Sequence, residues 1–84
     1  MDEKILDMRR RIDLIDDSLI STLEERLGIV NELMKYKIQQ NLPIEDVERE
    51  REIINKYKGR INPDLAYALF TIIFEESKRG FSGR

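Results

Sequence analysis

A long segment without proline is the feature that most constrains this chain. Residues 2–40 contain no proline and are rich in Leu, Ile, Met, Glu, Lys and Arg, which favour helix. Apolar residues recur along the segment, and at about 100° per residue they fall within an arc of roughly 80°. They are Met8, Ile12, Ile15, Leu19, Leu23, Val30 and Leu33. We therefore expect one amphipathic helix over about residues 2–40, ended by the Asn-Leu-Pro sequence at 41–43.

The rest of the chain predicts two shorter helices. An apolar face predicts a helix over about residues 45–58, with Gly59 directly after it. A third helix is expected over about residues 62–79, because Asn62 suits the N-cap, Pro63 suits the first turn and Asp64 complements the helix dipole. No segment is predicted as a strand. The expected fold class is all-α, with three helices in a single domain over residues 1–84.

The length of the first helix bears on assembly. A helix of about 38 residues is about 57 Å long, whereas a compact monomer of 84 residues has a diameter of roughly 30 Å. Its apolar stripe would therefore extend beyond any globule that its own chain can form, and a second copy is the expected cover. We expect an intertwined homodimer with the long helices antiparallel. The alternative is a helix that folds back on itself near Gly28.

The inventory of side chains narrows the possible chemistry. The chain has no His and no Cys, which excludes Ser–His and Cys–His catalysis, disulfides, and metal sites with His or thiolate ligands. A net charge of −2 argues against general nucleic-acid binding. No apolar run is long enough to span a membrane, and the Met-Asp-Glu-Lys start does not resemble a signal peptide, so we expect a cytoplasmic protein.

Two cations lie inside the apolar stripe of the first helix. Arg26 and Lys37 are 11 positions apart, which leaves them about 20° apart around the helix and about 16 Å apart along it. An unpaired cation is costly to bury, so each needs a carboxylate, a ligand or water. The pair could bind a small molecule with separated anionic groups, or could instead snorkel or pair with internal Glu residues.

Other polar residues also lie on inward faces. On the second helix Asp46, Arg49 and Glu50 share a face with Ile53, which suits either a ligand site or a weak surface ladder of ion pairs. On the third helix Ser77 is inward-facing, and such a Ser usually donates to a backbone carbonyl of its own helix.

Arg9 flanks the stripe near the start of the first helix. In an antiparallel dimer it could approach the region of Arg26 and Lys37 in the other chain. The alternative is that Arg9 belongs to a solvated basic cluster with the two arginines that follow it.

Taken together, these residues resemble the all-α chorismate mutase family over nearly the whole chain. The resemblance rests on Met8-Arg9-x-x-Ile12-x-x-Ile15-Asp16, Leu23-x-x-Arg26, Lys37, Leu42-Pro43-Ile44-x-Asp46-x-x-Arg49-Glu50 and Leu69-Phe70-x-x-Ile73-x-x-x-Ser77. It implies a domain-swapped homodimer with two active sites. It also implies an isomerase that converts chorismate to prephenate by a Claisen rearrangement, toward phenylalanine and tyrosine in the shikimate pathway.

The resemblance also implies roles for individual residues. Arg26, Ser77 and Arg9 from the partner chain would bind the two carboxylates of the substrate, and Lys37 would contact a carboxylate and the ether oxygen of the breaking bond. The ring hydroxyl would be held by Glu50 and the backbone of Asp46. Arg49 would position Glu50 and would itself contact the bound substrate. Lys37, Glu50 and Arg26 would be the catalytic residues. Such a rearrangement needs no nucleophile, cofactor or metal, because it depends on holding the substrate in a compact geometry.

One position departs from the family pattern. The family usually has a Gln four residues after the Ser, which donates to the ether oxygen, and here that position is Phe81, beyond Gly80. Losing one such donor typically costs about 2.7–4 kcal/mol. Lys37 could act alone, Arg79 could substitute for the Gln, or the C-terminal tail could close the site differently. An isochorismate-pyruvate lyase on the same scaffold and a non-catalytic helical dimerisation or regulatory domain stay open as alternatives.

Overall fold

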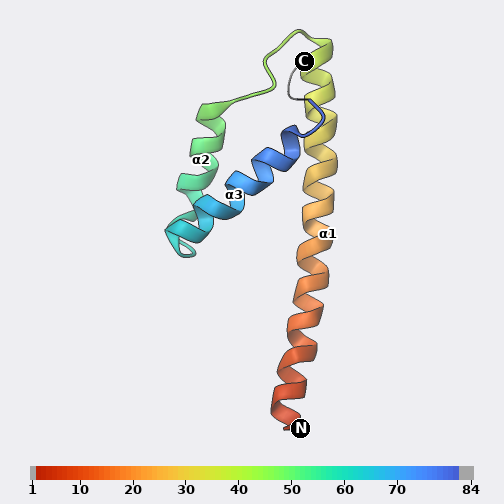
Figure 1. Ribbon diagram of the computed structural model, residues 1–84, viewed down its shortest axis with the longest axis vertical. Helices are drawn as coiled ribbons and strands as arrows, with labels where there is room; N and C mark the ends of the chain where they lie inside the picture. The colour runs from red at the N-terminus through yellow and green to blue at the C-terminus, as the bar shows by residue number, and fades with distance from the viewer. Residues whose placement is uncertain (1, 82–84) are drawn as a thin grey trace. The chain divides into compact units, whose positions relative to one another are not determined.

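The computed structural model describes residues 2–81 and contains three α-helices (Figure 1). These are α1 (Glu3–Gln39), α2 (Val47–Tyr57) and α3 (Pro63–Lys78). Within residues 2–81 there is no strand, so the predicted all-α fold class with three helices is confirmed. Each helix begins and ends one or two residues inside the range expected from the sequence. None of the described helices combines the length and apolarity needed to cross a membrane.

The chain divides into two compact units, residues 1–30 and residues 31–84. The described part of the first unit is most of α1, and the second unit holds the last turns of α1 together with α2 and α3. The assignment of residues 1–84 to a single domain therefore stays a prediction.

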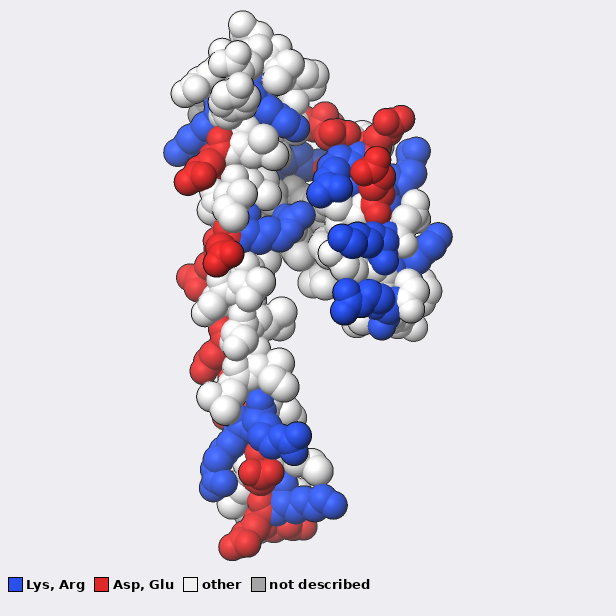
Figure 2. All heavy atoms as spheres, turned by 180° about the vertical axis from the view of Figure 1, so that it is seen from behind, with Lys and Arg blue, Asp and Glu red and all other residues white. Residues whose placement is uncertain are grey.

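The first unit carries an exposed apolar stripe. Uncharged side chains run along α1 beside a row of acidic ones in Figure 2, and the large apolar side chains of the stripe are 45–65% exposed. They are Ile5, Met8, Ile12, Ile15 and Leu19. Because α1 continues without a break through Gly28, the alternative of a helix folded back at that residue is wrong. Apolar surface of this extent marks an interaction face in a protein of this size.

The end of α1 is a Schellman motif. Asn41 adopts the left-handed conformation, with φ of 59°, which Asn tolerates better than most residues. The N–H of Leu42 donates to the Lys37 carbonyl at 2.8 Å, and the N–H of Asn41 donates to the Ile38 carbonyl at 3.1 Å. Pro43 follows and cannot continue the helix. The chain therefore turns away from α1 directly after the turn that carries Lys37.

Side-chain caps set the starts of α2 and α3. The Asp46 carboxylate accepts the N–H of Arg49 at 3.0 Å, and the Asn62 side-chain oxygen accepts the N–H groups of Asp64 and Leu65 at 2.9 and 3.2 Å. Each cap satisfies backbone donors that a helix leaves open at its first turn. The predicted N-cap at Asn62, with Pro63 as the first helical residue, is confirmed.

Aromatic rings join α2 to α3. The two helices are connected by a short turn and run in roughly opposite directions (Figure 1). The Tyr57 ring stacks on Phe70 with centroids 5.4 Å apart, and Phe70 lies 5.8 Å from Phe74. Such pairs contribute about 0.5–1.5 kcal/mol each beyond the area that they bury. The buried side chains of this second unit are Met34, Ala66, Ile73, Phe74, Ser77 and Phe81.

A type II turn follows α3. Arg79 is extended, with φ −62° and ψ 131°, and Gly80 has φ of +89°. The N–H of Phe81 donates to the Lys78 carbonyl at 3.0 Å, which closes the turn. The third helix therefore ends at Lys78, and the turn carries the Phe81 side chain into a buried position, where it is 8% exposed.

Candidate active site

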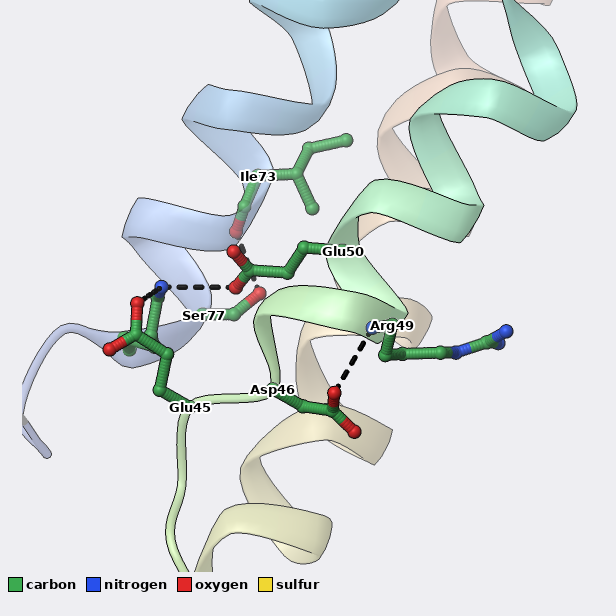
Figure 3. Close-up of polar contacts among 7 residues, drawn as sticks. Glu45, Asp46, Arg49, Glu50, Ile73 and Ser77 are labelled. Atoms are coloured by element: carbon green, nitrogen blue, oxygen red, sulfur yellow. Dashed lines mark hydrogen bonds and ion pairs between the residues drawn. The ribbon is translucent and has the colours of Figure 1, made fainter.

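An ion pair between α2 and α3 lies at the centre of the candidate site. The Nζ atom of Lys78 donates to Oε2 of Glu50 at 3.0 Å and lies 3.5 Å from Oε1 of Glu45 (Figure 3). The Lys78 and Glu50 side chains are only 23% and 26% exposed, whereas Glu45 is 61% exposed. The pair with Glu50 is therefore better shielded from solvent than an ordinary surface ion pair.

The packing of the two helices explains why these residues meet. Tyr57 on α2 stacks on Phe70 on α3. Glu50 precedes Tyr57 by two helical turns, and Lys78 follows Phe70 by slightly more than two turns. Since the helices run in roughly opposite directions, the stacked rings set a register in which Glu50 and Lys78 face each other.

The electrostatics of the pair favour the charged form of Lys78. The hydrogen bond to Glu50 raises the pKa of Lys78 above its ordinary value of 10.5. Partial burial lowers the pKa, but the hydrogen bond to Glu50, together with the negative charges of Glu50 and Glu45, outweighs this effect. The ammonium is therefore fully charged at neutral pH, where it faces the Glu50 carboxylate.

The Arg49 side chain lies away from the Glu50 carboxylate, and its role in the site stays a prediction. Its guanidinium lies 3.7 Å from the Glu52 carboxylate, and both side chains are about two-thirds exposed. In Figure 3 the Arg49 side chain points away from Glu50, which points toward α3. Consecutive residues of a helix do not face each other, so the side chain that contacts the Glu50 carboxylate is Lys78.

Asp46 sits one residue before α2. Its side chain is used as the N-cap of that helix, and its carbonyl accepts the N–H of Glu50 at 3.1 Å. The first turn of α2 therefore fixes the backbones of Asp46 and Glu50 relative to each other.

Ser77 is buried on α3, and its hydroxyl donates to the Ile73 carbonyl at 2.7 Å (Figure 3). This is the arrangement that the sequence favours for an inward-facing Ser in a helix. Because the hydroxyl has only one proton, donating to a carboxylate requires that proton to turn away from the Ile73 carbonyl. Binding of substrate by Ser77 stays a prediction.

The cations of α1 are divided between the units. Lys37 is half-buried in the last turn of α1, within the same unit as Glu50 and Ser77. None of the ion pairs found among residues 2–81 involves Lys37. Arg26 is half-buried and Arg9 is exposed, and both belong to the first unit. Their convergence on one ligand stays a prediction.

Two residues bear on the absence of the Gln that the family usually has four residues after Ser77. Phe81 is buried and its side chain has no hydrogen-bond donor. The Arg79 guanidinium lies 2.8 Å from the Glu76 carboxylate on the exposed side of α3. Arg79 is thus engaged with its own helix, and the choice among the alternatives for the missing Gln stays a prediction.

Lys78 is the residue of this site that the sequence reasoning missed. A usable signal was present, because Phe70, Phe74 and Lys78 recur every four residues and so share one face of α3.

Within residues 2–81 the structure has no cluster of three or more acidic side chains with the geometry to hold a metal ion.

Comparison with known proteins places this chain in a family. Residues 8–80 match the sequence pattern of the family described as chorismate mutase type II. The chain is 28% identical to the chorismate mutase of Methanocaldococcus jannaschii over 83 residues, covering 93% of this chain and 84% of the relative.

Two further relatives are much longer proteins. Both are bifunctional chorismate mutase/prephenate dehydratases, and the chain spans only about a fifth of their length. The one from Buchnera aphidicola is 33% identical, with 87% of this chain and 20% of the relative covered. The one from Aquifex aeolicus is 35% identical, with 81% and 18% covered. No solved structure gives a significant match. Because the family match extends over almost the whole chain, this protein belongs to the chorismate mutase type II family.

Proposed function

We propose that this chain is a chorismate mutase, an isomerase that converts chorismate to prephenate by a Claisen rearrangement. The observation that carries the proposal is the family match over residues 8–80. That range includes every residue of the expected site except Phe81, and the relative from M. jannaschii named chorismate mutase is matched over 84% of its length. The dehydratase named in the bifunctional relatives is not part of the proposal.

The reaction suits the side chains that are present. Chorismate is a flexible dianion, and its rearrangement proceeds once the two reacting ends are held together. Arg26, Ser77 and Arg9 bind the two carboxylates, a task that suits the guanidinium group. Negative charge develops on the ether oxygen as the C–O bond breaks, and a preorganised ammonium at Lys37 stabilises that charge more in the transition state than in the substrate.

The other end of the substrate carries the ring hydroxyl. The hydroxyl donates a hydrogen bond to the Glu50 carboxylate, and the backbone at Asp46 contacts the same hydroxyl. In support of this, Glu50 is half-buried at the start of α2 and is fixed to Asp46 by the first helical hydrogen bond. The first turn of α2 thus places the backbones of both residues close together.

The site is shared between two chains of a homodimer. Support for the dimer comes from the exposed apolar stripe of α1, because a second copy with the same stripe can cover it by twofold symmetry. In an antiparallel pairing Arg9 of one chain approaches the Arg26 and Lys37 region of the other. Sedimentation should therefore give a dimer of about twice the 10.0 kDa chain mass.

A direct assay tests the activity. The purified chain is incubated with chorismate, and the loss of chorismate absorbance is followed together with the appearance of prephenate. A second reaction with isochorismate is assayed for release of pyruvate. Turnover of chorismate to prephenate above the uncatalysed rate is expected. Pyruvate release from isochorismate alone would instead identify a lyase, and no turnover of either would favour a non-catalytic module. The cytoplasmic location and the role in making phenylalanine and tyrosine stay predictions.

A further inference from the structure

We propose that Lys78 is a positioning residue that holds the Glu50 carboxylate in the orientation needed to bind the ring hydroxyl of the substrate. The inference rests on the proposed function and adds a residue to which the family resemblance gives no role. It starts from the ion pair between α3 and α2 in which the two charged atoms are 3.0 Å apart (Figure 3).

The ion pair with Lys78 restricts the orientation of the Glu50 carboxylate and leaves other acceptor positions of that carboxylate open to a ligand. A glutamate in water turns freely about its last torsion angle, and a carboxylate has two oxygens with about four acceptor positions. The ammonium of Lys78 takes one position on Oε2. With that oxygen held, Oε1 is directed to a defined side of the group, where a hydroxyl can donate to it.

The ammonium is itself held from two sides. Glu50 lies in the first turn of α2, and Glu45 lies in the segment before that helix, 3.5 Å from the same nitrogen. The Lys78 ammonium at the end of α3 therefore forms ion pairs both with the start of α2 and with the segment that leads into it. A flexible lysine stem gains a fixed position from two carboxylates, which a single surface ion pair does not supply.

The surroundings leave room for a conservative replacement. Glu50 and Lys78 line part of a groove between α2 and α3 with a volume of about 550 Å³. A guanidinium at position 78 can extend into this groove and still reach Glu50. Arginine is therefore a suitable rescue variant, whereas methionine keeps the length of the stem and removes the charge.

The test compares two lysine positions in the same unit. Lys78→Met is measured beside Lys35→Met, which removes an exposed lysine of α1, and beside Lys78→Arg. We expect Lys78→Met to lower kcat/KM for chorismate about tenfold, as expected for loss of a hydrogen bond to a charged group. Lys35→Met should leave kcat/KM unchanged, and Lys78→Arg should restore most of the activity. Thermal unfolding followed by circular dichroism shows that each variant is folded.

A second substrate separates positioning from support of the fold. For a chorismate analogue without the ring hydroxyl, Lys78→Met and the unchanged protein should have the same kcat/KM, because Glu50 then has no hydroxyl to bind. An equal loss with both substrates would overturn the role of Lys78 and leave the proposed function intact. Absence of chorismate turnover by the unchanged protein would overturn both.

Discussion

The ring of Tyr57 stacks on the ring of Phe70 with centroids 5.4 Å apart, and this contact sets the register between α2 and α3. Two turns away, the same register brings the Glu50 carboxylate to the Lys78 ammonium. An apolar contact between two helices thus decides which charged side chains meet at the candidate site.

Replacing Lys37 should have a large effect on the chemical step. If its ammonium stabilises the developing charge on the ether oxygen without help from a family Gln, Lys37→Ala should lower kcat by about 10²–10³-fold. Lys35, two residues earlier and exposed, provides the matched control, and Lys35→Ala should retain full activity. Steady-state rates with chorismate measure both variants. Equal rates for the two would show that the site is assigned to the wrong lysine.

A mixture of two inactive variants tests whether the site is shared. In the proposed dimer, each site takes Arg9 from one chain and Lys37 from the other. Arg9→Ala and Lys37→Ala homodimers should each be nearly inactive, whereas a heterodimer of the two has one site with both residues intact. When equal amounts are unfolded and refolded together, random pairing should restore about a quarter of the wild-type activity. Activity that stays at the level of the separate variants would mean that Arg9 acts within its own chain.

The Lys78 ion pair should give a pH-dependent contribution to stability. Folding raises the pKa of Lys78 above 10.5, chiefly through the hydrogen bond to Glu50. The contribution is therefore fully present below pH 10.5 and is lost as the pH rises through the higher folded-state pKa. Denaturant unfolding from about pH 8 to 12 should show the gap in unfolding free energy between wild type and Lys78→Met closing at the alkaline end. A gap that stays constant would contradict this.

The two glycines Gly28 and Gly80 should respond oppositely to alanine. Gly28 lies in the middle of α1, and a Cβ atom there would meet nothing within 4 Å. Gly28→Ala should raise the unfolding free energy by about 1 kcal/mol, since alanine is the better helix former. Gly80 has φ of +89°, and alanine at this left-handed position should cost about 1–2 kcal/mol. Urea denaturation compares the two, and a destabilising Gly28→Ala would indicate a close approach by another chain.

Phe81 should matter for stability more than for chemistry. Because its ring is buried, Phe81→Gln should lower the unfolding free energy by about 1.5–3 kcal/mol. Phe81→Leu keeps an apolar side chain and should lose less. Both variants are expected to keep the wild-type kcat where they are folded, since the ring offers no donor to the substrate. A loss of kcat in folded Phe81→Leu would show that the aromatic ring itself closes the site.

Much of the fold is readable from the sequence because its determinants are local. The cap at Asn62, the proline at 63 and the stop at Asn41 act on backbone groups within a few residues, so they set the ends of helices without reference to the rest of the chain. The inward position of Ser77, and its hydrogen bond to Ile73 four residues earlier, follow from helical periodicity alone.

The ion-pair partner of Glu50, in contrast, depends on contacts between residues far apart in the sequence. Arg49 is its neighbour in the sequence, but consecutive side chains diverge around a helix, and Arg49 pairs with Glu52 instead. Lys78 is 28 residues away and meets Glu50 because aromatic packing fixes how α3 lies on α2.

The sequence by itself therefore determined the three helices, the cap at Asn62 and the stop at Asn41, because helix formation depends on short-range hydrogen bonds and periodicity. The tertiary structure alone decided that Lys78 holds Glu50 and that Phe81 is buried. Those contacts depend on the register between packed helices and on where a turn sends the chain, and neither is encoded in the spacing of neighbouring residues.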